Sequence, residues 1–373
     1  MTTPNEPTVI DAPPPYADAS VETLIIGAGA CGLTAALRAH HEGREVLVLE
    51  RDETATGSTS LSSGFVPAPG TRFQRAINVD DTPDLFCADV MAKSHDTSDP
   101  ALARLAADNI APAIEWLADH AGIEWIVLDD FLYPGHSRHR MHAVPEKTGA
   151  ALQARFLAAA ADIPIATNAR ATTLYRESDR ISAVGVDRGD TTEIIACDTL
   201  ILACNGYGGN PDLVAKHIPE IADGPYFGHT GNTGDAVLWG EAMGAEILHL
   251  SGYQGHGSVA HPHGILITWA LMMEGGVQVN SDGRRFSNEH LGYSEQGPHV
   301  LAQPGSVAWD VYDAPIHEFA MNGFPDYRDA QAAGAVKTAK TVADLAALIG
   351  APVAAIDETL AHCATLPDAS ADP

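Results

Sequence analysis

Apolar and polar positions near the amino terminus change from a strand pattern to a helix pattern within a few residues. Thr23–Ile26 is a short apolar run typical of a buried strand, and a glycine-rich turn follows it at once. The next segment, Leu33–His41, predicts a helix that stops before Gly43, and Val46–Leu49 predicts a second strand. A strand, a glycine turn, a helix and a strand in this order are typical of a nucleotide-binding α/β unit.

The glycines of this turn, at positions 27, 29 and 32, have the spacing GxGxxG. The first allows a tight turn, the second lets the backbone approach a pyrophosphate, and the third lets the helix pack closely on the strand. Glu50 ends the second strand near the place, roughly 20 residues on, of the acid that holds a ribose. The presence of this acid disfavours the alternative, a packing turn without a ligand. The pattern predicts a dinucleotide site formed by Gly27, Ala28, Gly29, Ala30, Cys31, Gly32, Glu50 and Arg51.

Helical and strand patterns alternate along the rest of the chain, which predicts an α/β protein. Helices are expected at 99–121, 148–161, 236–243, 341–349 and 352–366, and strands at 170–175, 181–187, 192–196 and 199–203. The last of these strands runs into a second glycine turn, Cys204–Gly209, which fits another close approach of backbone to ligand. Composition changes near residue 250, where glycine and histidine become frequent and regular periods become few.

A stretch of small hydroxyl-bearing residues follows the second predicted strand, and it has neither a helical nor a strand period. Such a loop suits close approach to a large flat ligand, with hydroxyls as hydrogen-bond donors, and the alternative is a flexible linker. The residues expected to contact the ligand are Gly57, Ser58, Thr59, Ser60, Ser62, Ser63 and Gly64.

The net charge of −28 argues against nucleic acid and anionic membranes as partners. No apolar run approaches the ~20 residues needed to span a bilayer. Residues 1–20 are acidic and rich in proline and are expected to be a disordered tail. The five cysteines form no CxxC pair and are expected to be reduced, in a cytoplasmic protein.

A cluster of basic residues lies between positions 134 and 145 of this acidic chain. It suggests an anion or carbonyl clamp formed by His136, Arg138 and Arg140, or a neighbour of the pyrophosphate. A metal site built from His136, His139 and His142, or from His261 and His263, is a weaker alternative, because no cysteine lies nearby and no HExxH motif occurs. A hydrolase is disfavoured, because the sequence has no GxSxG motif.

Taken together, these segments resemble the FAD-dependent fumarate reductase and 3-oxosteroid dehydrogenase group of flavoproteins over nearly the whole chain. The glycine turn with Glu50 resembles the group's ADP-binding turn, and 57–64 its flavin-contacting loop. Further similar segments are Leu202–Tyr207, Thr233–Asp235, Tyr253–His256 and Val279–Glu289, the last with the pattern V-N-x-x-G-x-R-F-x-N-E.

The resemblance implies a Rossmann-like FAD-binding domain at 21–254 with an inserted α+β capping domain at 255–366, and a short tail at 367–373. It implies FAD as the cofactor, held also by Ala171, Ala203, Cys204, Asn205, Gly206, Thr233 and Asp235. Arg285 is implied as the residue that transfers a proton while flavin N5 exchanges hydride, and His256 as a hydrogen-bond partner of the substrate.

Two departures from the group's pattern bear on the reaction. Trp269 and Met272 stand at the acidic and basic positions of the proton path of fumarate reductases, which puts fumarate reduction in doubt and makes the substrate pocket more apolar. The group's sequences also continue into a segment that returns to the FAD domain, so this sequence is expected to be a C-terminally truncated member.

The predicted function is therefore an FAD-dependent oxidoreductase that acts on CH–CH bonds next to a carbonyl or carboxylate. The expected partners are a small substrate, either an enone, a steroid-like molecule or a carboxylate, and an unidentified electron donor or acceptor. The alternatives are a non-catalytic flavoprotein fragment and a metal-dependent enzyme built on the histidine clusters.

Overall fold

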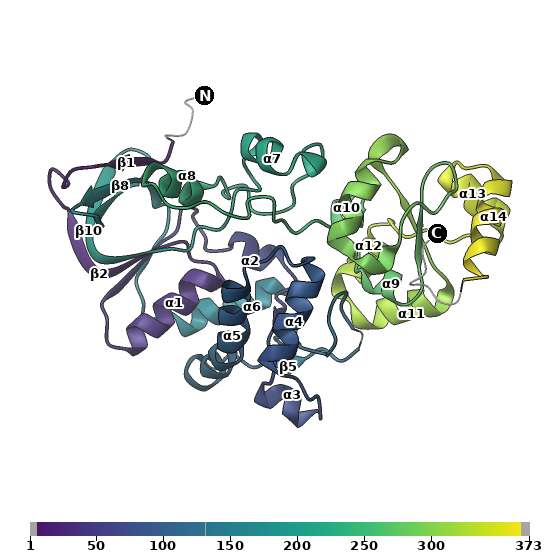
Figure 1. The fold of residues 1–373 in the computed structure, drawn as a ribbon, viewed down its shortest axis with the longest axis horizontal. Coiled ribbons are helices and arrows are strands. Elements are labelled where there is room, and N and C mark those ends of the chain that lie inside the picture. Colours follow the sequence, from purple (N-terminus) through teal and green to yellow (C-terminus); the bar gives the residue numbers. More distant parts are fainter. Residues whose placement is uncertain (1–5, 131, 367–373) are drawn as a thin grey trace.

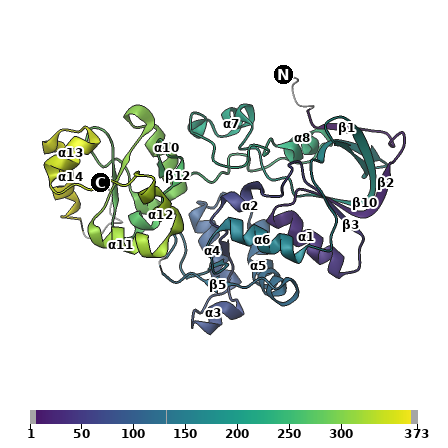
Figure 2. The same ribbon diagram turned by 180° about the vertical axis from the view of Figure 1, so that it is seen from behind.

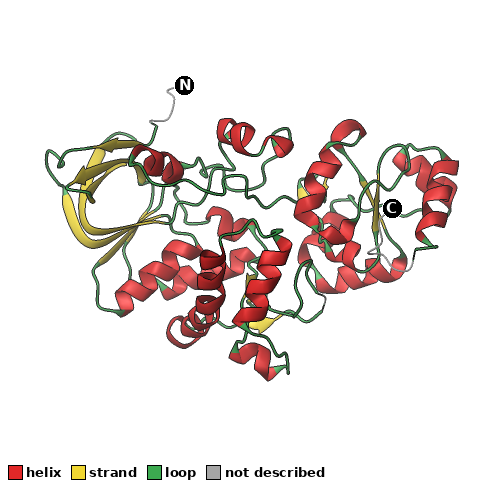
Figure 3. Ribbon diagram, in the orientation of Figure 1, coloured by secondary structure: helices red, strands yellow, loops and turns green. Residues whose placement is uncertain are grey.

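The computed structural model describes residues 6–130 and 132–366, so the ends of both predicted tails, 1–5 and 367–373, lie outside the described residues. Two units lie side by side along the longest axis of the molecule (Figure 1), and the view from behind shows the same arrangement (Figure 2). A curved sheet lies at the far end of the larger unit, and helices dominate the smaller one (Figure 3). We call the smaller unit, from residue 255 to 366, the cap.

The main sheet of the larger unit has seven strands in the order β1-β8-β9-β10-β2-β3-β7. Their bounds are β1 Thr8–Ile10, β2 Ala19–Ile26, β3 Val46–Leu49, β7 Ile165–Ala166, β8 Arg170–Glu177, β9 Arg180–Asp187 and β10 Thr192–Leu202. Strands β10, β2, β3 and β7 run parallel to one another, whereas β8, β9 and β10 form an antiparallel meander. The carboxyl ends of β10, β2 and β3 therefore meet at one edge, where α/β proteins bind ligands.

Three helices cover one face of this sheet, α1 Ala30–His41, α5 Pro100–Ala121 and α6 Gly149–Ala159. Their apolar stripes bury Leu33, Ile114 and Phe156 against Ile25 and Val48. The other face packs against the meander and against Trp239 of α8 (Asp235–Ala242). The parallel strands are thus apolar on both sides, as expected of a sheet covered on both faces.

A side lobe and a short helical segment complete the larger unit. The lobe contains α2 Gly57–Leu61, α3 Arg72–Ala76, α4 Pro83–Lys93 and a small sheet, β4 Val66–Pro67, β5 Ile126–Val127 and β6 Met141–Ala143. The helical segment contains α7 Pro211–His217 and a 3-10 turn, η1 Pro219–Ile221.

The cap has two apolar cores of its own. One gathers around Trp269, Met272 and Tyr327, and the other around Val277 and Ile356. Its strands are β11 Val259–Ala260, β12 Ile265–Leu266, β13 Val277–Val279 and β14 Trp309–Val311. Its helices are α9 Ala270–Met273, α10 Tyr293–Leu301, α11 Ala314–Gly323, α12 Pro325–Ala332, α13 Val342–Ile349 and α14 Val353–Cys363, with 3-10 turns η2 Glu289–Leu291 and η3 Pro304–Ser306.

The predicted α/β fold is confirmed, with three local corrections. The tail prediction is wrong for Thr8–Ile10, which pairs with β8 as a parallel edge strand, and for the first residues of β2. The predicted loop at 57–64 begins as the short helix α2, because tertiary contacts with α6 override its weak pattern. The strands predicted at 192–196 and 199–203 form one long strand, β10.

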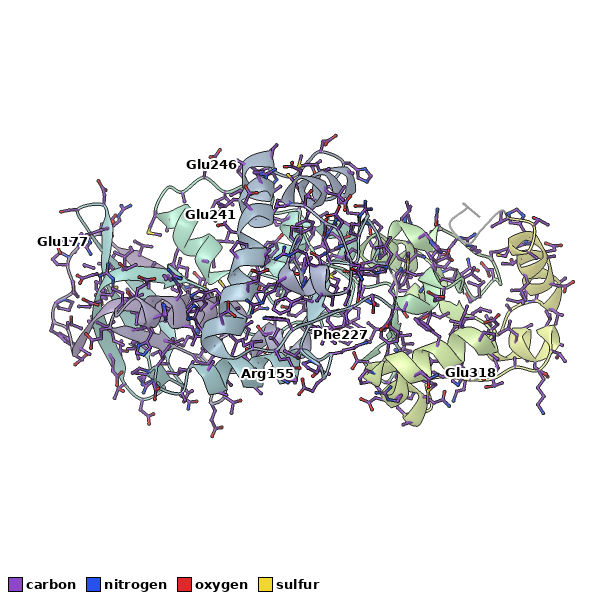
Figure 4. The ribbon with its side chains drawn as sticks, turned by 90° about the horizontal axis from the view of Figure 1, so that it is seen from below. Arg155, Glu177, Phe227, Glu241, Glu246 and Glu318 are labelled. Carbon is purple, nitrogen blue, oxygen red and sulfur yellow. The ribbon has the colours of Figure 1, made fainter. Side chains whose placement is uncertain are left out.

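Besides the connecting segment, the two units meet where α4 and η1 of the larger unit contact α10 of the cap. Lys93 at the end of α4 donates to the carbonyl oxygen of Leu291 and pairs with Glu295 of α10 at 2.5 Å. Phe227 lies where the units approach each other (Figure 4), and a Cβ at Gly264 would lie 3.9 Å from its ring. The connection itself, residues 244–252, is mostly exposed and has no regular secondary structure.

We expect limited proteolysis to separate the two units at this connection. Glu246 lies in it, is exposed, and points away from the molecule in Figure 4, so a glutamate-specific protease should cut there first. Mass spectrometry of the first fragments checks the site. Glu246→Gln should suppress the cut, whereas Glu241→Gln, in the neighbouring helix α8, should not. First cuts spread over residues 260–360 would contradict the division into two units.

Candidate functional site

The three glycines of the first turn occupy three different environments. A Cβ at Gly27, whose φ is +107°, would lie 2.4 Å from the Ala203 carbonyl oxygen, and one at Gly32 would lie 1.8 Å from the Gly27 carbonyl oxygen. These two glycines therefore allow β2, β10 and α1 to approach closely. At Gly29 the nearest atom to a Cβ is the Thr59 hydroxyl oxygen, at 3.2 Å. Gly29 thus borders open space at the start of α1, where a phosphate is expected.

Glu50 is held firmly at the end of β3. Its side chain is almost fully buried, and its two carboxylate oxygens accept hydrogen bonds from the backbone N–H groups of Ala28 and Asp52, each at 3.1 Å. An ionised carboxylate has about four acceptor positions, so this one retains capacity for a ribose hydroxyl pair.

The hydroxyl-rich segment contacts both the glycine turn and the region near residue 232. Thr59 accepts the Ala30 N–H at 2.9 Å, and Ser58 accepts the Asn232 side-chain amide at 2.8 Å. Arg51 donates to the Gly231 carbonyl oxygen at 2.7 Å. The segments predicted to hold the cofactor therefore lie together around the carboxyl ends of β2, β3 and β10.

The second glycine turn joins the same site from the other side. The Gly234 N–H donates to the Gly206 carbonyl oxygen at 3.1 Å, and Thr233 donates to Asp235 at 2.7 Å. Asn205 has a left-handed backbone, φ +66°, and burial raises the pKa of the Cys204 thiol to about 11. Of the other predicted residues, Ser60 lies on α2, Ser63 and Gly64 follow it, Cys31 is exposed in the first turn of α1, and Ala171 is buried in β8.

One buried atom beside the glycine turn fits a bound cofactor. The Gln153 side chain donates to the carbonyl oxygens of Ala28 and Ala55, at 2.7 and 2.8 Å. Its own carbonyl oxygen is buried and accepts no hydrogen bond from the described residues. Such an acceptor costs about 1–3 kcal/mol unless a donor, such as a hydroxyl of a dinucleotide, reaches it.

The basic cluster predicted to clamp an anion is instead part of the protein's own ion pairing. Arg140 is completely buried, and its guanidinium pairs with Asp81 at 2.9 Å and with Asp89 at 2.5 Å. Arg138 is exposed and donates to the carbonyl oxygens of Asp80 and Ser137. Two carboxylates far away in sequence already neutralise Arg140, and its role in binding substrate stays a prediction.

The histidines of this cluster lie in different environments and do not act together. Burial lowers the pKa of His136 to about 4, and burial also lowers the pKa of His142, whose ring bonds Thr71 at 2.8 Å. Among residues 6–130 and 132–366, no three His, Cys, Asp or Glu side chains come together as possible ligands of one ion. The described part of the chain thus gives the metal alternative no support.

His256 lies in the cap between two aromatic rings. It stacks on Tyr293, with ring centroids 5.2 Å apart and planes 19° apart, and it meets the edge of Trp269 at 5.9 Å. Burial lowers the pKa of His256 to about 4, so the imidazole is neutral at pH 7. Its Nδ1 accepts the Ser258 N–H at 3.1 Å, which leaves the ring proton on Nε2. Trp269 and Met272 are buried in the first cap core.

Arg285 is buried in an ion pair of the cap. Its guanidinium donates to both carboxylate oxygens of Glu289, at 2.9 and 2.6 Å for Oε2 and 3.2 Å for Oε1. The side chains of both residues are at most 2% exposed. The role of Arg285 in proton transfer stays a prediction.

Two tyrosines that the sequence analysis did not single out lie at the meeting of the units. Tyr293 begins α10 of the cap, and its hydroxyl accepts from Gln254 at 3.3 Å. Tyr133 comes from the side lobe, and burial together with the nearby Tyr293 raises its pKa above the usual range. A cavity of about 270 Å³ in the side lobe is lined partly by Phe86, Lys93 and His136, and the His136 ring lies 6.2 Å from that of Tyr133. The sequence feature that could have pointed to Tyr293 is its position four residues after Glu289, the last residue of the V-N motif.

The environment of Gly29 predicts the effect of filling it. Gly29→Val should abolish FAD binding, because its φ of −80° suits valine while the added methyls occupy the phosphate approach. Flavin titration followed by absorbance measures this. Gly323→Ala is the matched control, since no atom lies within 4 Å of its Cβ position. Wild-type FAD affinity in Gly29→Val would place the pyrophosphate elsewhere.

The burial of neutral His256 predicts a loss of stability in acid. An unfolded histidine binds a proton near pH 6.5, but this one does so only near 4, so acidification through this window favours the unfolded state. Between pH 7 and 5, the unfolding free energy of the wild type should fall by up to about 2 kcal/mol more than that of His256→Gln. Urea unfolding at both pH values measures it, with His299→Gln on the exposed side of α10 as control. Equal pH dependence in all three proteins would contradict the neutral state.

None of the helices in the described part of the chain is both long and apolar enough to cross a bilayer. Comparison with known proteins then identifies the family. The model of a family described as FAD binding domain matches residues 22–371. NADH:fumarate oxidoreductase of Klebsiella pneumoniae is 29% identical over 340 residues, which cover 89% of this chain and 36% of that protein. This chain thus spans about a third of that relative's length.

Solved structures agree on the fold. The open conformation of a flavocytochrome c3 fumarate reductase has a TM-score of 0.76 at 26% identity, covering 93% of this chain and 61% of that one. A 3-ketosteroid-Δ4-(5α)-dehydrogenase from Rhodococcus jostii has a TM-score of 0.72 at 20% identity, covering 93% and 77%. The predicted cofactor, FAD, and the predicted resemblance are confirmed. The chain belongs to the family of FAD-binding domains found in the fumarate reductase type of FAD-dependent oxidoreductase.

Proposed function

We propose that this flavoprotein transfers hydride and a proton across a C–C bond conjugated to a neutral carbonyl group of an apolar substrate. The observation that carries the proposal is the stacked pair of His256 and Tyr293, which presents uncharged hydrogen-bond donors where the two units meet. Burial keeps the imidazole of His256 neutral and raises the pKa of the Tyr293 hydroxyl, so both side chains are uncharged at pH 7.

The cations near this place favour a neutral substrate over a dicarboxylate. Lys93 is paired with Glu295, and Arg285 with Glu289. Arg140, which lines the cavity, is paired with Asp81 and Asp89. A dicarboxylate would have to compete with these protein carboxylates for each cation, whereas a carbonyl oxygen needs only a neutral donor.

The side chains divide the chemistry among themselves. Bound FAD would supply or accept the hydride. The Nε2–H of His256 donates to the carbonyl oxygen, where negative charge develops as the conjugated C=C bond is reduced. The Tyr293 hydroxyl gives its proton to the carbon next to that carbonyl, while the β-carbon receives the hydride, so the C=C bond becomes a CH–CH bond. Burial keeps this hydroxyl protonated at pH 7, so the proton to be transferred is present on it.

Trp269 meets the His256 ring edge-on and Phe65 packs against Tyr133, and these aromatic rings would suit an apolar substrate. The electron donor that would reduce the flavin is a further partner whose chemistry these residues do not specify. We also place the protein in the cytoplasm as a proposal, which is supported by its five free cysteines.

The test uses the FAD-loaded chain, reduced anaerobically and mixed with either cyclohexenone or fumarate. We expect the enone to reoxidise the flavin, or at least to perturb its absorbance on binding, at concentrations where fumarate does neither. A response to fumarate alone would refute the preference for a neutral carbonyl.

Two matched variants distinguish the proton donor. Tyr293→Phe should bind FAD and the enone normally but reoxidise about a hundredfold or more slowly, because phenylalanine lacks the transferable proton. Arg285→Lys should instead lower the unfolding free energy of the cap by about 3 kcal/mol, seen as a lower melting temperature. Lysine lacks the planar pair of N–H donors that satisfies buried Glu289. If Arg285→Lys is fully stable yet inactive, while Tyr293→Phe is active, Arg285 is the donor that the sequence motif implied.

A further inference from the structure

Directly after His256 in the sequence, residues 257–258 join a hydrogen-bonded group of polar side chains in the cap. Gln278 of β13 and Asp310 of β14 face each other across the two-stranded pair. Their neighbours on the same strands, Val277, Val279 and Val311, pack into the second cap core. The opposite face of this two-stranded ribbon therefore carries polar side chains inside the cap. Burying them costs more free energy than burying an apolar pair unless they are hydrogen-bonded.

These two side chains are linked directly to the segment that follows His256. Asp310 accepts the hydroxyl of Ser258 on one oxygen and the amide of Gln278, at 2.7 Å, on the other. The same amide donates to the Gly257 carbonyl oxygen at 2.9 Å. The Gln278 carbonyl oxygen accepts from Gln296 of α10 at 2.9 Å, so the glutamine is fully satisfied. Gln278 and Ser258 are almost fully buried, at 1% and 5% exposure.

The main chain of Gly257 and Ser258, which Gln278 and Asp310 hold in place, determines which nitrogen of the His256 ring carries the proton. The Ser258 N–H donates to Nδ1 of His256, and the Gly257 N–H donates to the Tyr293 carbonyl oxygen at 2.9 Å. A backbone N–H can only donate, so Nδ1 must be the unprotonated nitrogen, and the ring proton must be on Nε2. The position of Ser258 relative to the ring is thus what selects the tautomer.

We propose that Asp310 and Gln278 are positioning residues that fix the main chain at 257–258 and thereby hold His256 in its Nε2–H tautomer. The inference rests on the proposed function in one respect, because it makes His256 an obligate donor and so specifies a substrate atom that accepts. A substrate that presents an N–H or O–H group to His256 would face two donors, the Nε2–H of His256 and the Tyr293 hydroxyl, and would be rejected. Asp310 and Gln278 act only through His256.

The test reads the tautomer itself. Protein labelled with ¹⁵N at histidine is loaded with FAD, and two-bond ¹⁵N–¹H correlations report which ring nitrogen carries the proton; His256→Gln assigns the signal. In the wild type, His256 should show one fixed neutral tautomer at pH 7. Ser258→Ala keeps the backbone N–H but removes the link to Asp310, and Asp310→Asn turns one of its two acceptors into a donor. Each should shift the ratio of tautomers toward Nδ1–H by about fivefold, the equivalent of one lost hydrogen bond.

The control is Tyr312→Phe, in the same cap. It removes the hydroxyl bond to Tyr327, at 2.7 Å, and leaves residues 256–258 untouched. Melting temperature and flavin absorbance show that each variant is folded; should Asp310→Asn unfold the cap, Ser258→Ala decides. Wild-type histidine signals in folded Ser258→Ala, or an equal shift in Tyr312→Phe, would overturn the proposal.

The measurement is made without substrate, so it is independent of the reaction. A fixed tautomer together with no response to enones would refute the proposed function alone. An active enone reductase whose tautomer is unaffected by Ser258→Ala would refute the positioning role alone.

Discussion

The buried ion pair between Arg285 and Glu289 is the interaction on which the arrangement of the cap depends. Glu289 is fully buried and also accepts the Gln278 N–H at 2.7 Å, while its carbonyl oxygen accepts the indole N–H of Trp269 at 3.2 Å. One residue therefore joins β13, α9 and the turn that leads into α10. Desolvating such a pair costs several kcal/mol per ion, so its effect is more to specify one arrangement than to add stability.

That arrangement matters because the site is composite. Tyr293 and His256 belong to the cap, whereas Tyr133 and the proposed flavin site belong to the larger unit. Lys93 connects them, since it bonds the Leu291 carbonyl oxygen and Glu295 on either side of Tyr293. A second contact joins η1 of the larger unit to the same helix, α10, so both contacts reach the cap through the helix that begins at Tyr293.

The sequence predicted local features well and pairings across long separations poorly. The glycine turn was predictable because GxGxxG, its strand, its helix and Glu50 all lie within about thirty residues. The ion pairs of Arg140 were not predictable, because its partners, Asp81 and Asp89, lie more than fifty positions away and nothing in a local pattern reveals them. Thr8–Ile10 was missed for the same reason, since its only pairing partner is β8. Tyr293 was overlooked because the motif drew attention to a charged residue rather than to a neutral one.

Charge accounting links the fold to the chemistry. In a chain with a net charge of −28, carboxylates outnumber cations by more than two to one, so a buried arginine readily finds a carboxylate within the protein. Arg140 and Arg285 have done so, and Lys93 pairs with Glu295 between the units, which leaves Tyr293 and His256 as neutral donors there. Neutral donors in a partly buried site are desolvated at little cost and lose little when they meet a carbonyl. The excess of carboxylates in the sequence therefore accounts both for the paired arginines and for the neutral hydrogen-bond donors of the site.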